Sequence, residues 1–478
     1  MRKKILNIKY LYIFISLLLV VPSIAYLIKN KTIMNFNEYF TFFLKNPNTS
    51  SEAIVNMVVF GTIIISLFIV YAIILKKHVE LFKNKIKLFA YIAIISVIFV
   101  IAIPFTTSDI FYYMGTGWID AKYGKNPYYV SVKEVREEIL NDELLDRTGV
   151  WEGQTVVYGP LWAYACKVLS KLSFGNATLG LYIYKLAALL VHLGATFLIY
   201  KITKKNLFVL MYGLNPFILF EGLTNVHNDL YLIFFILLAM YFLVRKKSIL
   251  FSVISLALAT VIKYVSILFL PFILIYYFRE KKPLKRIAHC ILYGVIFLGI
   301  ILGLYIIYMQ DINIFFAMLL QQSKMRESLI FIIYMIAQSS NLSFAMNVFN
   351  IIKWLIFISF TVIYIINVII LLFKNKITLN EIMRKCEKVV AIFLLTVISN
   401  LCPWYIMWLY PCIPWIKGKH IKQVIYISFA YEFCTLYNFG MHSESYLIGL
   451  AYIPTMLIIV LCLSFKQNKR KQEVKLFE

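Results

Sequence analysis

The sequence predicts an all-α, polytopic integral membrane protein, and two observations support this: its composition and the spacing of its apolar runs. Apolar residues make up 62% and aromatic residues 17% of the 478 residues, whereas soluble domains contain about 45–50% apolar residues. Runs long enough to cross a hydrocarbon layer of about 30 Å recur from Tyr10 to Phe465. We therefore expect about 12–14 transmembrane helices and no separate soluble domain.

The first apolar run, at about 9–28, follows a basic start and has the order of a signal peptide. It approaches about 20 residues and lacks a small-x-small cleavage site, so we interpret it as an uncleaved helix. Other long runs lie at about 54–75, 88–104, 178–200, 287–309, 347–373 and 446–465. Shorter runs, several of which need tilting or a re-entrant path to span, lie at about 206–221, 229–244, 248–262, 264–278, 388–401, 404–416 and 422–439.

The formal charge of +25 comes from short basic clusters between the apolar runs and not from one basic arm. This is the positive-inside pattern of membrane proteins, so no nucleic-acid partner is expected. The seven cysteines are scattered without CxxC spacing and are interpreted as core residues. If the N-terminus is cytoplasmic, fourteen crossings place every basic cluster on that side: 76–87, 201–206, 245–247, 279–286, 374–388, 417–422 and the tail.

The whole chain, 1–478, is predicted to be a single transmembrane domain. It would comprise two N-terminal helices in 1–87, a core in 88–440 and a last helix with a basic cytoplasmic tail in 441–478. The protein is then a multi-pass protein of the cytoplasmic membrane with both termini inside. The largest segment on the outer side is the loop 105–177.

This outer loop carries the features expected of a functional face. Residues 105–157 contain nine of the chain's 23 acidic side chains. The stretch "IFYYMGTGWIDAKYG" (110–124) places aromatic and apolar residues at helical offsets, and "YGPLWAYACKVLSKLS" (158–173) does the same with Pro160 near its first turn. Both predict amphipathic helices in the outer headgroup zone, where Trp and Tyr are favoured.

Asp109 is the first acidic residue after the third apolar run. One interpretation is that it merely caps the following helix, a role that Ser108 would fill equally well. The other is catalytic, because a carboxylate at the outer end of the hydrocarbon, among aromatic rings, is desolvated enough to act as a base.

A second polar cluster, Glu221, His227, Asn228 and Asp229, lies between two apolar runs on the same side. A tight turn needs only Asn-Asp and a glycine, so the Glu and His indicate function. A metal site is an alternative, although one turn rarely supplies three ligands with an open position.

Two lysines, Lys185 and Lys263, break the positive-inside pattern. They either snorkel to lipid headgroups or pair with an anion, and a phosphate is the natural partner.

The segment 400–415 packs three prolines and three tryptophans into a turn on the outer side. Broken backbone at membrane depth is tolerated where it lines a cavity, and an aromatic belt is the alternative. By the same reasoning, Asn215 and Pro216 predict a kink in the helix that contains them.

Five stretches resemble, in order, the polyprenol-phosphate-mannose-dependent mannosyltransferases of the GT-C superfamily, and among them the alpha-1,6-mannosyltransferase family. They are "SDIFYYMGTGWIDAKYGKNPYYV", "VYGPLWA", "LNPFILFEGLTNVHNDLYL", "KYVSILFLPFIL" and "CPWYIMWLYP", and the similarity spans about 88–420. The resemblance implies a membrane enzyme whose sugar donor is carried on a polyprenyl phosphate, with Asp109 in the place of the catalytic base. No Asp-x-Asp or Glu-x-Asp follows the third helix, so a divalent metal is not favoured and no cofactor is expected.

We therefore predict an inverting glycosyltransferase that moves a sugar, mannose or another hexose, from a polyprenyl-phosphate-sugar to a hydroxyl of an extracytoplasmic glycan or lipid-linked acceptor. The alternative is a flippase or transporter for lipid-linked oligosaccharides, which would favour inverted repeats that the sequence lacks. Asp109 is the predicted base. The predicted substrate-binding residues are Lys185, Lys263, His227, Asn228, Asp229, Tyr112, Tyr113, Trp118, Tyr158 and Trp404.

Overall fold

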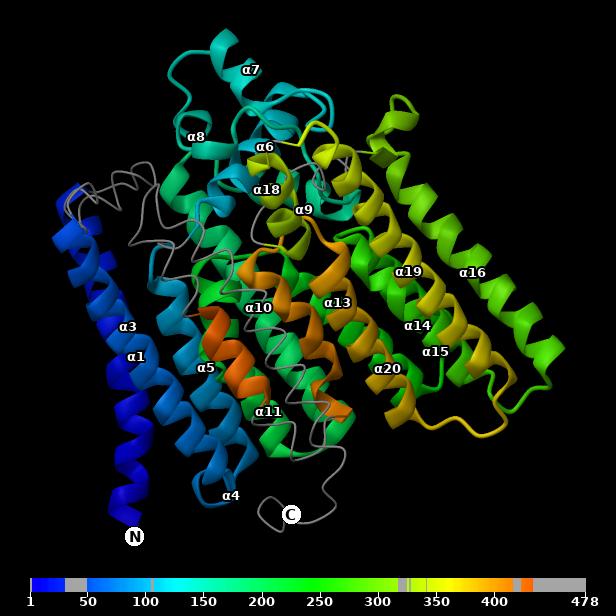
Figure 1. The fold of residues 1–478 in the computed structure, drawn as a ribbon. Helices are drawn as coiled ribbons and strands as arrows, with labels where there is room; N and C mark the ends of the chain where they lie inside the picture. The colour runs from blue at the N-terminus through cyan, green and yellow to red at the C-terminus, as the bar shows by residue number, and fades with distance from the viewer. Residues whose placement is uncertain are drawn as a thin grey trace.

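The structure, a computed structural model, is a bundle of helices with a helical cap at one end (Figure 1). It describes residues 2–30, 50–104, 107–316, 325, 328–340, 342–415 and 423–432, and no β-strand occurs among them. Five helices of these ranges are long and apolar enough to cross a membrane, and a bent pair makes a sixth. The predicted all-α polytopic membrane protein is confirmed. The count of about 12–14 crossings stays a prediction, because it depends on shorter helices and on residues outside these ranges.

The N-terminal pair consists of α1 (Arg2–Asn30) and α3 (Ser50–Lys76), followed by α4 (His78–Leu81) and α5 (Lys85–Ile101). The pair is tied to the core by two buried tyrosines. The hydroxyl of Tyr12 donates to the carbonyl of Leu214 at 2.7 Å, and that of Tyr71 donates to the carbonyl of Met211 at 2.8 Å. Both carbonyls lie next to a break in a core helix, where backbone acceptors are free of helical partners.

That break is the predicted kink. The helical axis bends by 49° between Asn206–Gly213 (α11) and Pro216–Thr224, which comprises α12 (Pro216–Leu219) and the π-helical turn η2 (Phe220–Thr224). The side chain of Asn215 accepts from the backbone N–H of Phe217 and donates to the hydroxyl of Tyr410 at 2.8 Å. Pro216 takes the first helical position, where its missing N–H leaves no bond unmade.

The remaining core helices surround this bent segment, and each contributes buried residues to the core. They are α10 (Ala177–Thr203), α13 (Asp229–Tyr241), η3 (Phe242–Lys246), α14 (Ile249–Thr260), η4 (Tyr264–Phe269) and α15 (Leu270–Tyr277). A helix over 423–432 packs against α3 through the rings of Phe68 and Phe429, whose centroids are 5.3 Å apart.

An outer layer lies beyond the core and turns apolar side chains outward. It consists of α16 (Pro283–Tyr305), η5 (Ile312–Phe316), α18 (Leu329–Ser339) and α19 (Ala345–Phe373). The segments α20 (Leu379–Ile392), η6 (Phe393–Val397) and η7 (Pro403–Trp415) follow, and most of their apolar residues are buried. Only 6% of the most apolar window of α16, and likewise of α19, is buried. Helices that are this apolar and this exposed face lipid.

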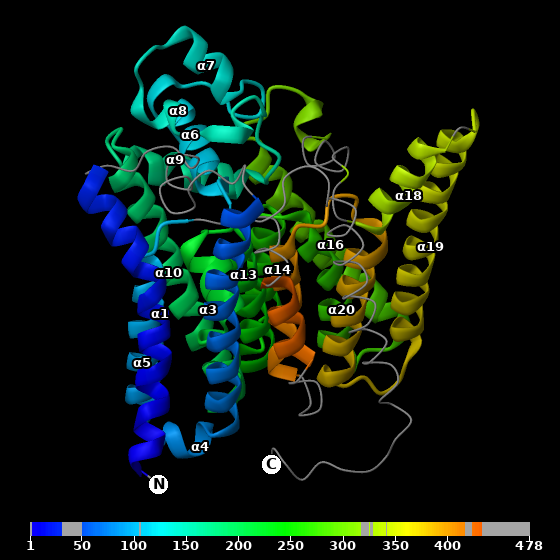
Figure 2. The ribbon, with the colours of Figure 1, turned by 60° about the vertical axis from the view of Figure 1, so that its left-hand side comes forward.

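The cap is built from the predicted outer loop. It contains α6 (Asp109–Tyr123), α7 (Val132–Glu138), α8 (Glu143–Asp146), η1 (Gly149–Trp151) and α9 (Pro160–Lys171), and Figure 2 shows it above one end of the bundle. Both helices predicted in this loop are present. α6 is buried from Asp109 to Asp120, more deeply than a helix at a headgroup surface. Gly117 allows this, because a Cβ there would fall 2.2 Å from the carbonyl oxygen of Cys166 on α9.

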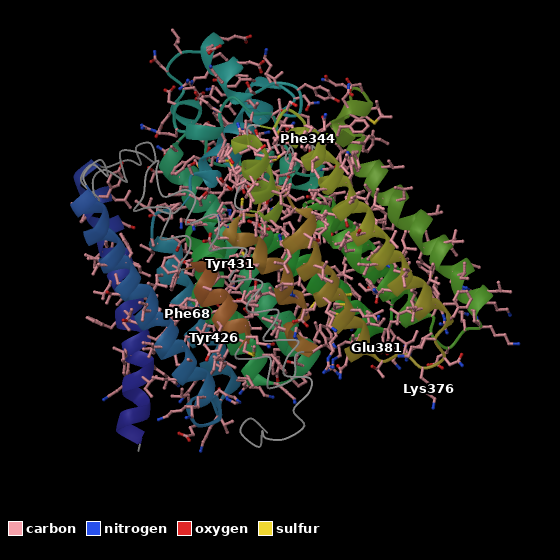
Figure 3. All side chains as sticks on the ribbon, in the orientation of Figure 1. Phe68, Phe344, Lys376, Glu381, Tyr426 and Tyr431 are labelled. Atoms are coloured by element: carbon pink, nitrogen blue, oxygen red, sulfur yellow. The ribbon has the colours of Figure 1, made fainter. Side chains whose placement is uncertain are left out.

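The basic loops within the described ranges gather at the end opposite the cap, as predicted. Side-chain bonds to carbonyls link them in a chain: Asn206 donates to Phe82, Arg245 to Ile202, Tyr277 to Lys247, and Arg286 to Arg279 and Leu372. Figure 3 labels Lys376 and Glu381 at this end and Phe344 at the other. The cluster 417–422 and the segment 441–478 lie outside the described residues, so the division of the chain at 87 and 440 stays a prediction.

Candidate active site

Asp109 lies where the chain leaves α5 and enters the cap, and its carboxylate does not cap α6. Thr107 Oγ1 accepts from the backbone N–H of Asp109 at 3.3 Å. The carboxylate instead accepts at Oδ1 from the indole N–H of Trp151 at 3.1 Å, and its Oδ2 lies 3.5 Å from Nδ1 of His227. The residue is 7% exposed. The capping interpretation therefore fails, and the carboxylate belongs to a cluster of side chains beneath the cap.

His227 joins Asp109 to a second carboxylate. Its Nε2 lies 3.0 Å from Oε2 of Glu221, and its ring stacks on the indole of Trp404 with centroids 3.8 Å apart and planes 13° apart. The N–H directions of His227 do not point straight at either carboxylate, so these are ion-pair contacts and not linear hydrogen bonds. The backbone before the ring is held in the left-handed region at Val226, with φ of 58°. The result is a buried row of Asp109, His227 and Glu221.

The charges of this row follow from its geometry. Burial lowers the pKa of His227, but the two flanking carboxylates outweigh burial and raise it to about 9. Burial raises the pKa of Asp109, but the close contact with the positively charged His227, together with the charge of Lys263, leaves it below its ordinary value. At neutral pH the row therefore holds an ionised Asp109 beside an imidazolium.

Lys263 and Asp229 form a second buried pair next to this row. The ammonium lies 2.8 and 2.7 Å from the two carboxylate oxygens of Asp229, and the indole N–H of Trp408 donates to the same carboxylate. The ring of Tyr405 lies under the ammonium, 4.5 Å from centroid to Nζ. Lys263 lies in the break between α14 and η4, where the backbone adopts an extended conformation.

A narrow cleft of about 20 Å³ runs past Lys263, with room for about one water molecule. Its walls include Tyr158, Tyr405 and Trp408, together with Ser399 and Asn400 from the other side. The cap, the break after α14 and η7 therefore meet at one opening.

Asn228 lies in the chain between His227 of the row and Asp229 of the pair. It is fully buried, and neither its amide nitrogen nor its amide oxygen has a hydrogen-bond partner among the residues the structure describes. Buried amides are nearly always satisfied by protein or water. The role of Asn228 in substrate binding stays a prediction, because Asn228 is not among the residues that line the cleft.

Lys185 is placed elsewhere. Its fully buried ammonium donates to the carbonyls of Ala102 at 2.7 Å, Thr224 at 2.8 Å and Leu223 at 3.0 Å. These bonds use all three of its protons, and Lys185 does not line the cleft. The lysine joins the end of α5 to η2, and so fixes the segments that carry Asp109 and Glu221 relative to each other.

The predicted aromatic residues divide between the cleft and the packing of the cap. Tyr158 lines the cleft and Trp404 stacks on His227, while the hydroxyl of Tyr113 donates to that of Tyr158 at 3.4 Å. Tyr112 donates to the carbonyl of Thr155 at 2.9 Å, and Trp118 donates to Asp142 at 2.9 Å. Tyr112 and Trp118 therefore hold the cap loops together.

Sequence reasoning missed Trp151, Tyr405 and Trp408 as site residues. Trp151 lies 42 positions from Asp109 in a loop without helical periodicity, so nothing local points to it. Trp408 had a weaker signal, because it lies in the same proline- and tryptophan-rich segment as Trp404, which folds as the 3-10 helix η7. No set of three His, Cys, Asp or Glu side chains within the described ranges is arranged to hold a metal ion.

Fold and site together define a polytopic membrane protein with a buried acid and imidazolium row under a helical cap. A family model described as Alpha-(1->6)-mannopyranosyltransferase, N-terminal domain, matches residues 13–279, more than half of the chain. The chain belongs to this family and is a glycosyltransferase of the mannosyltransferase class, as the resemblance implied. Comparison with curated proteins and with solved structures found no match. The matched region includes Asp109, His227 and Lys263, whereas η7 lies beyond it.

Proposed function

We propose that the protein transfers a mannosyl unit from a polyprenyl-phosphate donor to a hydroxyl of an extracytoplasmic glycan or lipid-linked acceptor, with inversion at the anomeric carbon. The observation that carries this proposal is the Asp109 carboxylate, ionised and buried at the mouth of a membrane bundle, under the cap. Membership of the family supports mannose as the sugar and favours transfer over the flippase alternative.

In the proposed step the acceptor oxygen attacks the anomeric carbon as its proton passes to Asp109. The bond from that carbon to the phosphate oxygen breaks on the opposite face, and its electron pair leaves with the polyprenyl phosphate. One displacement inverts the configuration. A positioned base contributes about 10²–10⁴ in rate.

His227 and Glu221 would support this base without touching the sugar. The imidazolium keeps Asp109 ionised at neutral pH, and Glu221 at 3.0 Å keeps the imidazole charged. The Trp404 ring prevents His227 from turning away. His227 is thus proposed as a positioning residue, whereas the sequence predicted a direct contact with substrate.

Lys263 would receive the donor phosphate. In the structure its charge is balanced by Asp229 in a cleft with room for about one water molecule, so the donor must open the cleft and share the ammonium. A phosphate competes well for it, because charge-assisted bonds to phosphate are among the strong ones. Tyr405 and Trp408 would then stack on the sugar face.

The mouth of this site is proposed to open outside the cytoplasmic membrane. The basic loops gather at the opposite end of the bundle, and such loops stay cytoplasmic. The polyprenyl chain would lie along the lipid-facing helices.

The test is Asp109→Asn in purified protein reconstituted with a polyprenyl-phosphate-mannose donor. We expect acceptor-dependent release of polyprenyl phosphate to fall by about 10²–10⁴. Asp146→Asn is the matched control, since it removes an exposed carboxylate from the same cap. Turnover near the wild-type rate in the Asp109 variant would remove the base assignment, and release without acceptor would argue against transfer.

A further inference from the structure

A groove of about 530 Å³ lies between α19 and α20, away from the candidate active site. It opens at the end of the bundle that carries the basic loops, where Figure 3 labels Glu381. Its lining has two parts: polar and basic side chains near Thr378, and apolar side chains farther along both helices.

The polar part has an excess of positive charge. Arg384, Lys385 and Lys388 line it from one side of α20. The ammonium of Lys385 donates to the amide oxygen of Asn367 on α19 at 2.5 Å, so it lies across the groove. Glu381 is the acidic residue of the lining, and its carboxylate is already paired with Lys374 at 2.6 Å. Arg384 forms no ion pair with any residue the structure describes.

The apolar part continues from the basic mouth toward the middle of the bundle. Phe360, Ile363, Val389 and Ile392 line it. Along α20, the lining runs from Thr378 to Ile392, about 20 Å at 1.5 Å per residue, comparable to a headgroup followed by much of an acyl chain. Ile363 is 49% exposed on a helix that faces lipid.

We propose that this groove binds an anionic phospholipid of the leaflet on the basic side. The headgroup phosphate would contact Arg384 and Lys388, and one acyl chain would lie along Phe360 and Ile363. Basic pockets between transmembrane helices on the cytoplasmic side bind anionic headgroups in this way. The occupant is not the sugar donor, because the candidate catalytic row lies at the other end of the bundle. A free phosphate would leave the apolar wall unused.

The experiment uses the full-length protein in detergent micelles, exchanged against phosphatidylglycerol or phosphatidylcholine with identical acyl chains, with bound lipid counted by native mass spectrometry. We expect one phosphatidylglycerol to be retained, and the double variant Arg384→Gln/Lys388→Gln to bind it about 10–30-fold more weakly, since each basic residue near an anionic surface contributes on the order of 1 kcal/mol. The matched control is Lys281→Gln/Lys282→Gln, which removes the same charge from exposed positions at the same end.

Three outcomes would overturn the proposal: equal retention of phosphatidylcholine, equal loss in the control variant, or displacement of the lipid by inorganic phosphate at an equal concentration. If the Arg384 and Lys388 variant fails to fold, the salt dependence of lipid binding to the wild-type protein still tests the proposal. Retention of phosphatidylglycerol should fall as NaCl is raised, because salt screens the headgroup contact. Retention that does not change with salt and does not differ between the two lipids would contradict the proposal.

Discussion

Lys185 and Lys263 are both buried lysines in a membrane protein, and the structure places them in opposite situations. Lys185 is surrounded by backbone carbonyls of Ala102, Leu223 and Thr224. Lys263 faces the carboxylate of Asp229 on the wall of a cleft. A carbonyl at the end of a helix cannot leave, whereas in the proposed function the carboxylate would share its cation with the donor phosphate. On the proposed function, the partner, and not burial, separates a structural lysine from a substrate-binding one.

The largest expected effect concerns Lys185, the lysine held by backbone carbonyls. Lys185→Met removes the donor from three buried carbonyls, and each buried acceptor left unsatisfied costs about 1–3 kcal/mol. We expect the free energy of unfolding to drop by about 3 kcal/mol or more, measured as a lower denaturation temperature in detergent. Protein that remains folded should keep its KM for the donor. A raised KM with unchanged stability would mean that Lys185 binds substrate after all.

The second prediction concerns Lys263. The double variant Lys263→Met/Asp229→Asn removes the pair without leaving a lone buried charge, which would itself be destabilising. Trp408 can still donate to the new amide oxygen. We expect kcat/KM for the donor to fall by about 10–100-fold, because hydrogen bonds to charged groups contribute about 1.5–3 kcal/mol.

The control for this variant is the denaturation temperature, which should stay within a few degrees of the wild type. Steady-state kinetics over a range of donor concentrations then separates binding from stability. If the variant loses stability but keeps its kcat/KM, Lys263 has a structural role like that of Lys185 and does not bind the donor.

The third prediction concerns pH and His227. Like Lys263, His227 is a buried cation whose partners are carboxylates. Its pKa is raised from 6.5 to about 9, so its contribution to stability is fully present below pH 6.5 and is lost as pH rises through about 9. Asp109 has a lowered pKa, so its contribution is present above its ordinary value and is lost only in acid. Above about pH 9 the charge that holds Asp109 in position is lost, although Asp109 itself stays ionised, and activity should decline.

His227→Gln should abolish this alkaline decline and lower the rate at neutral pH. The measurement is a pH profile of kcat/KM for both proteins. If the decline persists in the variant, another group controls it.

Local features of the sequence predicted more of the fold than of the contacts within the site. The kink at Asn215 and Pro216, the helices of the cap and the shared end of the basic loops follow from residue types and spacing. The site depends on pairs distant in the chain: Lys263 and Asp229 are 34 positions apart, and Asp109 and Trp151 are 42 apart. Which buried lysine meets a carboxylate is decided by how the bent helices pack, and no local pattern encodes it.

The smallest expected effect concerns Asn228, whose amide, unlike the two ammonium groups, has no partner within the described part of the chain. Asn228→Ala therefore removes no hydrogen bond from the folded protein, and the denaturation temperature should change little. If the amide binds a sugar hydroxyl, KM should rise by about 3–10-fold, the equivalent of one neutral hydrogen bond. Asn228→Asp is a second variant to compare, because it keeps a hydrogen-bond acceptor at this position but adds a negative charge beside Asp229. A loss of stability in the alanine variant with no change in KM would show that the amide is satisfied within the protein, by water, and takes no part in recognition.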